Sequence, residues 1–137
     1  MKKREAVAHI MTKIVATAHR DQSVLEVRKL MEEKGVRHVP VVEGKNLIGI
    51  VSRTDVLRAS YGLTPSEEQH NQGMLENVLV DAVMTHQPVS IHPDDSIREA
   101  AETLAELDFS ALPVIDDGQL VGIITTTDLI RYLLEQY

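Results

Sequence analysis

The sequence predicts an α+β fold made of two β-α-β-β-α units in tandem. Three observations predict it. The chain matches itself when shifted by 73 residues, apolar spacing changes from helical to strand-like within each copy, and Ser-x-x-Glu boxes mark helix starts. Its 137 residues, 43% of them hydrophobic, suit one globular domain or two small fused ones. We predict a first unit at 1–60, a linker at 61–80 and a second unit at 81–137.

The internal repeat aligns residues 9–58 with residues 82–131 without a gap. Fifteen of the fifty aligned positions are identical, whereas average composition would give roughly three by chance. The identical pairs include Met11 and Met84, Thr12 and Thr85, Gly49 and Gly122, and Asp55 and Asp128. The two copies are therefore expected to form the same supersecondary unit.

Each copy opens with a short helical turn that ends at Met-Thr, and a brief extended run follows, IVATA or PVSIH. A capping box comes next, Ser23 to Glu26 in the first copy and Ser96 to Glu99 in the second. In such a box the serine oxygen accepts a backbone N–H and the glutamate reaches back to the cap. Apolar residues then recur at helical spacing, which predicts a helix with one buried face in each copy.

Two short apolar runs separated by a glycine-containing polar turn follow each helix, and they predict a hairpin. The runs are HVPVVE with LIGIVS, and ALPVID with LVGIIT. A last helix is predicted to begin at Thr54-Asp55 and at Thr127-Asp128, since a hydroxyl and a carboxylate favour a helix start. A further capping box at residues 64–67, with proline at the first position, predicts a helix in the linker.

Composition and missing motifs argue against several classes of protein. The chain has no cysteine, so it has no disulfide, zinc thiolate or cysteine nucleophile. No export signal is apparent and no apolar stretch approaches the roughly 18 residues of a membrane span, so we expect a cytoplasmic protein without membrane insertion. A GxxxxGK phosphate loop and a GxSxG elbow are both missing, so no enzyme is predicted.

No metal site and no required cofactor are predicted either. The six histidines lack the spacing of zinc ligands. The acid pairs at residues 94–95 and 116–117 stand where aspartate is common for local reasons, before a capped helix and in a turn.

Charge is distributed unevenly along the chain. Residues 1–60 hold twelve of the fourteen Lys and Arg residues but only seven of the twenty-one acids, and residues 61–137 hold the rest. A phosphate-bearing ligand would be favoured by the first half, and head-to-tail self-complementarity explains the asymmetry equally well. The net charge of −7 argues against nucleic-acid binding, for which the basic run at residues 2–4 is the sole support.

These features resemble paired cystathionine β-synthase (CBS) domains, which form Bateman-type regulatory modules. The resemblance covers nearly the whole chain and rests on both Met-Thr openings, the Pro-containing strands and the segments GIVSRTD and GIITTTD. It implies two units packed sheet to sheet about a pseudo-twofold axis with two symmetry-related clefts, and modules that often pair as homodimers. In similar proteins an adenosyl ligand lies in each cleft, with its ribose on an aspartate and its phosphates near basic and hydroxyl groups.

The resemblance assigns a first group of ligand residues. Asp55 and Asp128 are expected to accept the ribose hydroxyls through charge-assisted hydrogen bonds. Hydroxyls and backbone donors at the starts of the last helices suit a phosphate, and simple helix capping is the competing explanation. These hydroxyls belong to Ser52, Thr54, Thr125 and Thr127.

Two basic residues, Arg37 and His38, distinguish the copies, because their counterparts Ser110 and Ala111 carry no charge. A guanidinium suits a phosphate, and the imidazole could add charge below about pH 6.5. Solvated strand-end side chains are the competing explanation. If the basic residues bind ligand, one site should favour AMP, ADP or ATP, and the other should be weaker, empty or suited to a less charged adenosyl ligand.

A second group of residues is assigned to the walls and surroundings of the adenine and phosphate. An extended apolar run beside a core helix is buried by default, so the wall positions are core first and ligand contacts second. The group comprises Ile14, Val15, Thr17, Pro40, Arg53, Pro88, Ser90 and Pro113.

Two functions follow as hypotheses. The first is a regulatory sensor that binds an adenine nucleotide or S-adenosylmethionine and responds through its conformation or dimer arrangement. The alternative is a ligand-independent dimerisation or scaffold module that docks on an unidentified partner enzyme or transporter through its acidic second half and linker.

Overall fold

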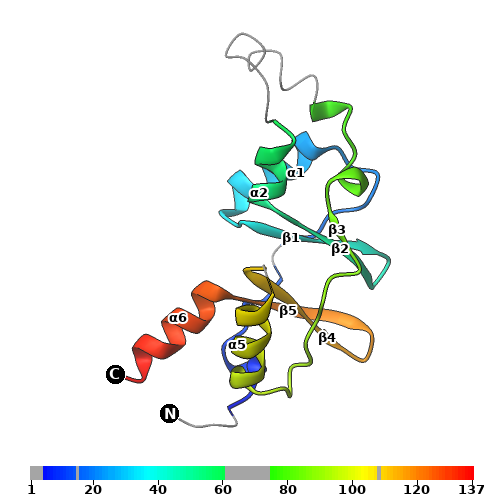
Figure 1. The fold of residues 1–137 in the computed structure, drawn as a ribbon. Helices are drawn as coiled ribbons and strands as arrows, with labels where there is room; N and C mark the ends of the chain where they lie inside the picture. Colours follow the sequence, from blue (N-terminus) through cyan, green and yellow to red (C-terminus); the bar gives the residue numbers. More distant parts are fainter. Residues whose placement is uncertain (1–4, 15, 61–74, 108) are drawn as a thin grey trace. The chain divides into compact units, whose positions relative to one another are not determined.

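The computed structural model describes residues 5–14, 16–60, 75–107 and 109–137. The chain divides into two compact units. The first-repeat unit is residues 15–87, and the second-repeat unit combines the chain up to Ile14 with Pro88–Tyr137 (Figure 1). The predicted linker helix at residues 64–67 lies outside the described residues.

The first-repeat unit is a small sheet covered by two helices. Its elements are α1 (Val24–Lys34), β1 (His38–Glu43), β2 (Asn46–Ser52), α2 (Arg53–Arg58), the 3-10 helix η2 (Val80–Ala82) and β3 (Thr85–His86). β1 and β2 form an antiparallel hairpin, and β3 adds antiparallel to β2. The extended run before α1 contributes a single parallel bridge, from Ala18 to Val41, instead of a full strand.

The second-repeat unit has the same plan. Its elements are the 3-10 helix η1 (Val7–His9), α5 (Ile97–Glu106), β4 (Ala111–Asp116), β5 (Gln119–Thr125) and α6 (Thr126–Glu135). β4 and β5 form an antiparallel hairpin, while Ile91 bridges Val114 in parallel. The predicted α+β class is therefore confirmed, with a β-β-α core in each unit and the first strand of each copy reduced to one bridge.

The segments that open the two copies are exchanged between the units. η2, from the start of the second copy, lies in the first-repeat unit, where the Val80 N–H donates to the Gln22 carbonyl at 2.8 Å. η1, from the start of the first copy, lies in the second-repeat unit, where the Val7 N–H donates to the Asp95 carbonyl at 2.8 Å. Each unit thus joins the Met-Thr opening of one copy to the helix and hairpin of the other.

Two glycines permit this exchange. A Cβ atom added at Gly49 would meet the Met84 Sδ atom at 2.5 Å, and one added at Gly122 would meet the Met11 Sδ atom at 2.6 Å. Only a residue without a side chain allows each methionine to lie this close to the neighbouring strand. The repeated Met and Gly residues are therefore packing partners across the two copies.

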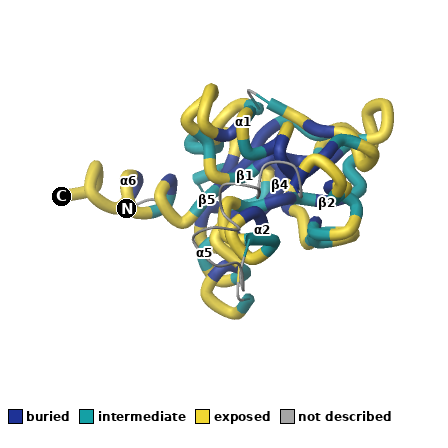
Figure 2. The backbone as a smooth tube through the Cα atoms, turned by 90° about the horizontal axis from the view of Figure 1, so that it is seen from above, coloured by how far each residue is buried: buried dark blue, intermediate teal, exposed yellow. Residues whose placement is uncertain are grey.

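Each unit buries its own apolar core, which gathers in the strands and the inner helix faces (Figure 2). The second-repeat core consists of Val7, Ile91, Ala100, Leu104, Leu112, Val114 and Ile124. The first-repeat core is larger and includes Val24, Val27, Val39, Val41 and Val51. Within the described part of the chain, no helix has the length and apolar character needed to cross a bilayer.

Helices α1 and α5 are capped by the predicted serines, but their predicted capping boxes are incomplete. Ser23 Oγ accepts the Glu26 N–H at 3.1 Å and so caps α1, but Glu26 Oε2 accepts from Gln22 Nε2 at 3.0 Å instead of completing the box. The predicted box at Ser96 is incomplete as well, since Ser96 Oγ accepts the Glu99 N–H at 3.0 Å without a return bond from the Glu99 side chain. Complete capping boxes occur at the next helix of each unit, at Ser52 and Thr125. α2 and α6 consequently begin one residue before the predicted threonines, because the preceding hydroxyl is the true cap.

Candidate functional site

In the first-repeat unit, Asp55 lies at the start of α2 and has a capping role. Its Oδ2 atom accepts the Ser52 N–H at 2.8 Å, and Ser52 Oγ accepts the Asp55 N–H at 3.1 Å. Its Oδ1 atom lies 4.0 Å from Arg58 Nη1 and accepts no hydrogen bond from the described residues. The side chain is 17% exposed. Oδ2 therefore caps the helix, whereas Oδ1 can still accept a hydrogen bond.

The predicted basic residues adjoin this cap. His38 pairs with Ser52 across the hairpin, and the Arg37 carbonyl accepts the Arg53 N–H at 2.8 Å. Arg37, Arg53 and Thr54 are exposed, whereas His38 is half-buried. The hairpin therefore brings the first-group residues of the first copy together at one end of β1 and β2.

The environment of His38 disfavours its charged form. Burial lowers the pKa of His38, the nearby Asp55 carboxylate partly opposes that effect, and Arg37 lowers the pKa further. The imidazole is consequently neutral at pH 7, and it becomes charged only at a pH lower than the value of about 6.5 expected from the sequence. At neutral pH the positive charge near Asp55 comes from the arginines.

The His38 pKa predicts a pH-dependent stability. Between the lowered folded pKa and about pH 6.5 the unfolded chain binds more protons than the folded chain, so stability falls as the pH drops through that window. We expect His38→Gln to reduce the loss of stability between pH 7 and pH 5, as measured by urea unfolding. His19→Gln, at an exposed position, is the control. Equal losses in the wild type and His38→Gln would contradict the prediction.

Asp128 occupies the equivalent position at the start of α6. Its Oδ2 atom accepts the Thr125 N–H at 2.9 Å, and Thr125 Oγ1 accepts the Asp128 N–H at 3.1 Å. Its Oδ1 atom additionally accepts the hydroxyl of Thr12 at 3.0 Å, and the residue is buried. Thr127 is exposed one position before it. Both carboxylates thus cap helices, which was the competing explanation for this motif.

The second hairpin repeats the backbone arrangement without the basic residues. The Ser110 carbonyl accepts the Thr126 N–H at 2.9 Å, and Ala111 pairs with Thr125. The two hairpins therefore present similar backbones and different charges.

The second-group residues are divided between the units. Pro40 and Pro113 are buried in β1 and β4 and are core residues. Thr17 belongs to the first-repeat unit, whereas Ile14, Pro88 and Ser90 belong to the second-repeat unit. Val15 lies outside the described residues. Neither unit by itself collects these side chains, so their role as adenine walls stays a prediction.

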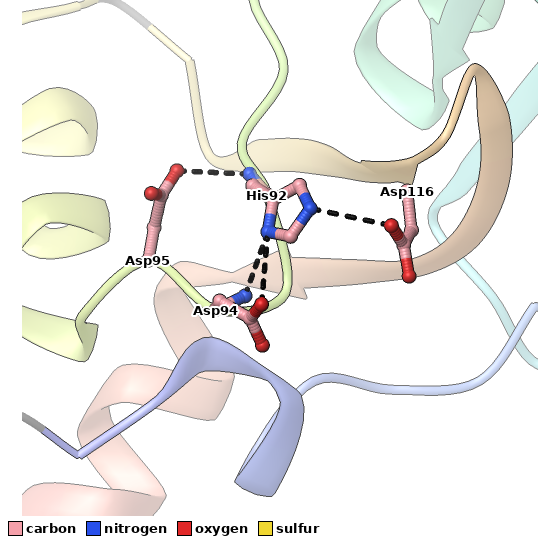
Figure 3. Close-up of polar contacts among 4 residues, drawn as sticks. All are labelled: His92, Asp94, Asp95 and Asp116. Atoms are coloured by element: carbon pink, nitrogen blue, oxygen red, sulfur yellow. Dashed lines mark hydrogen bonds and ion pairs between the residues drawn. The ribbon is translucent and has the colours of Figure 1, made fainter.

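The acid-rich loop before α5 holds a histidine network (Figure 3). The His92 N–H donates to Asp95 Oδ2 at 2.9 Å, the Asp94 N–H donates to His92 Nδ1 at 3.0 Å, and His92 Nε2 lies 3.2 Å from Asp116 Oδ1. This network ties the loop to the end of β4. Across the described ranges, no three His, Asp or Glu side chains are grouped so that they could hold a metal ion.

Sequence reasoning missed Thr12 as a neighbour of the site. Its identity with Thr85 was visible in the repeat, but the Met-Thr opening gave no sign that its hydroxyl would meet a carboxylate 116 positions away. That contact depends on the exchange of the opening segments.

Comparison with known proteins identifies relatives of both repeats. The CBS domain family model matches residues 7–62 and 80–135. The chain is 34% identical to inosine-5'-monophosphate dehydrogenase of Korarchaeum cryptofilum over 116 residues, which are 84% of this chain and 21% of that protein. It is 31% identical to the CBS domain-containing protein YhcV of Bacillus subtilis, covering 90% of this chain and 82% of that protein.

The share covered differs among the relatives. The chain is 37% identical over 133 residues to protein MJ0188 of Methanocaldococcus jannaschii, covering 95% of this chain and 44% of that protein. Like the dehydrogenase match, this leaves more than half of the relative outside the alignment. The activities of the longer relatives therefore belong to proteins with additional sequence.

Solved structures of similar fold include proteins with adenosyl ligands. CBSX2 from Arabidopsis thaliana has a TM-score of 0.83 at 31% identity, with 96% of each chain covered. CBSX2 in complex with AMP has a TM-score of 0.79 at 29% identity, covering 96% of this chain and 98% of that one. The CBS domain pair of protein MJ0100, in complex with 5'-methylthioadenosine and S-adenosyl-L-methionine, has a TM-score of 0.80 at 25% identity over the same shares.

Proposed function

This chain belongs to the CBS domain family, and on that premise we propose that it binds an adenine nucleotide or related adenosyl ligand as a regulatory sensor, without catalysing a reaction. The observation that carries the proposal is the state of Asp55, whose Oδ1 atom accepts no hydrogen bond from the described residues. Relatives of the same fold support it, since CBSX2 has been solved with AMP and the MJ0100 pair with 5'-methylthioadenosine and S-adenosyl-L-methionine.

The ligand chemistry follows from the groups at the end of the first hairpin. Asp55 Oδ1 would accept a ribose hydroxyl through a charge-assisted bond, which selects a nucleoside over a bare phosphate. Arg37 and Arg53 would supply positive charge for a phosphate, and the hydroxyl hydrogen of Ser52 is left to donate because its oxygen already accepts a backbone N–H. A nucleotide satisfies both the acceptor and the cations, and the adenosyl ligands of CBSX2 and the MJ0100 pair favour adenine as its base.

A sensing role requires that the ligand bind one conformation of the chain, or of its dimer, better than another. Inosine-5'-monophosphate dehydrogenase, of which the chain matches 21%, is a relative in which a similar segment forms part of an enzyme. We propose that this chain contributes regulation to a partner protein and supplies no catalytic residue itself.

The test is an equilibrium titration with AMP, ATP and S-adenosylmethionine. We expect at least one of them to bind with a Kd below about 1 mM. Asp55→Asn should weaken that binding by about tenfold or more, because one hydrogen bond to a charged group contributes roughly 1.5–3 kcal/mol. Asp21→Asn, at an exposed position in the loop before α1, is the matched control and should bind as the wild type does.

Two results would contradict the proposal. The absence of saturable binding for all three ligands would refute the sensor, and an Asp55→Asn variant that binds as tightly as the wild type would refute the role given to Asp55. The first result, combined with a homodimer in light scattering, would favour the ligand-independent docking module. The apolar residues exposed on α6 suit that alternative, since Ile130 is 53% exposed and Leu134 is 69% exposed.

A further inference from the structure

The carboxylates of Asp55 and Asp128 are equivalent in the repeat but differ in their hydrogen bonds. Both use Oδ2 to accept the N–H of their helix cap. At Asp128 the Oδ1 atom also accepts the Thr12 hydroxyl at 3.0 Å. Asp55 Oδ1 has only Arg58 Nη1 nearby, at 4.0 Å. Both oxygens of the Asp128 carboxylate thus accept a hydrogen bond from the protein.

The counterpart of Thr12 does not form the same bond. Thr85 is identical in the repeat and lies in β3 of the first-repeat unit, where it pairs with Ile50. Among the described residues its side chain donates no hydrogen bond to Asp55. The difference between the two carboxylates is therefore a property of the tertiary structure, because the local sequence contains the same threonine and aspartate.

Burial and charge add to the difference. Asp128 is buried, whereas Asp55 is partly exposed. The strand beside Asp128 begins with Ser110 and Ala111, where the first copy has Arg37 and His38. A ligand that approached Asp128 Oδ1 would compete with the Thr12 hydroxyl for that oxygen. Its phosphate would meet Ser110 and Thr126 at the positions where the first copy has Arg37 and Arg53.

We propose that Thr12 closes the Asp128 carboxylate to ligand, so that the chain binds one adenosyl ligand, through Asp55. This inference rests on the proposed function and assigns its stoichiometry to one residue. Thr12 is a specificity-determining residue in this scheme, since removal of its hydroxyl returns an accepting oxygen to Asp128. The opened site would take an uncharged adenosyl ligand, because it lacks counterparts of Arg37, His38 and Arg53.

The experiment is a calorimetric measurement of stoichiometry with AMP and with 5'-methylthioadenosine. We expect one ligand per wild-type chain, bound at least about tenfold more weakly by Asp55→Asn. Thr12→Val should bind a second 5'-methylthioadenosine with at least tenfold higher affinity than the wild type shows for any second molecule. That gain should disappear in Thr12→Val/Asp128→Asn. Thr85→Val, the matched control, should still bind one ligand.

Thr12→Val keeps the backbone contacts of the segment. The Thr12 N–H donates to the Ile123 carbonyl at 2.8 Å and the Ile123 N–H donates to the Thr12 carbonyl at 2.9 Å, and neither bond uses the side chain. Thr12→Ser, which retains a hydroxyl, should behave as the wild type. Far-UV circular dichroism and thermal unfolding would verify that each variant folds.

The outcomes separate the inference from the function on which it rests. Two ligands per wild-type chain, or a Thr12→Val variant that still binds one, would overturn the role of Thr12 and leave the adenosyl-binding function standing. No binding to the wild type or to Thr12→Val would overturn the proposed function itself. One ligand that Asp55→Asn binds as tightly as the wild type would show that Asp55 is not the carboxylate that binds it.

Discussion

Gly49→Val is expected to lower the free energy of unfolding by about 3 kcal/mol, as measured by urea denaturation. Even a Cβ atom at this buried position would meet Met84 Sδ at 2.5 Å and the Thr85 carbonyl oxygen at 3.0 Å. The methionine can shift, but the carbonyl belongs to β3 and is held by pairing with β2. Valine adds two methyl groups to this conflict, so the strands must separate or the methionine must leave the core.

A rescue experiment can show which methionine opposes Gly49. Met84→Ala should destabilise the chain by itself, yet the Gly49→Val/Met84→Ala variant should be more stable than the sum of the two single effects, by at least about 1 kcal/mol. Met11→Ala should give no such rescue of Gly49→Val, and should instead rescue Gly122→Val. If Met11→Ala rescued Gly49→Val instead, the hairpin of each copy would pack against the opening segment of its own copy.

Leu112→Ala is expected to cost about 3 kcal/mol or more of unfolding free energy, because it leaves a cavity in the smaller of the two cores. Leu112 lies in β4 opposite Ile124 and is only 1% exposed. This core is small and includes Val7 from the opening of the chain. Few other side chains are therefore available to move into the cavity. Thermal or urea unfolding at fixed protein concentration measures the loss.

Leu134→Ala provides the matched control, since Leu134 lies in α6 and is 69% exposed. Leucine and alanine have similar helix propensities, so the change should alter stability by less than about 0.5 kcal/mol. If both substitutions cost the same, the burial assigned to Leu112 would be incorrect.

At the candidate site, the sequence identified the local motifs but not the distant residues that contact them. The motifs around Asp55 and Asp128 correctly indicated a hydroxyl and a carboxylate at a helix start, and the structure shows both as capping boxes. Their role as ribose ligands stays a prediction. The start of each helix was wrong by one residue, because the caps Ser52 and Thr125 are also the last residues of their strands, where a serine or threonine suits the strand and the helix equally well.

The exposure of a side chain and its ionisation state could be known only from the tertiary structure. The sequence placed His38 beside the predicted site as a possible cation, but burial and Arg37 lower its pKa. Likewise, the loop histidine at position 92 gave no sign of its contact with Asp116, which comes from a different element. Such effects depend on atoms brought together from distant positions, and periodicity carries no information about them.

The sequence by itself determined the duplication, the α+β class, the serines that start α1 and α5, and the hairpins, because these signals act within a few residues of one another. Only the tertiary structure decided which copy each Met-Thr segment joins. A duplicated chain offers two nearly equivalent surfaces, Gly49 with its strand and Gly122 with its strand, and a local pattern cannot choose between them. The choice depends on long-range backbone hydrogen bonds and core packing, and it places the Thr12 hydroxyl on Asp128, whereas Asp55 Oδ1 accepts no hydrogen bond from the described residues.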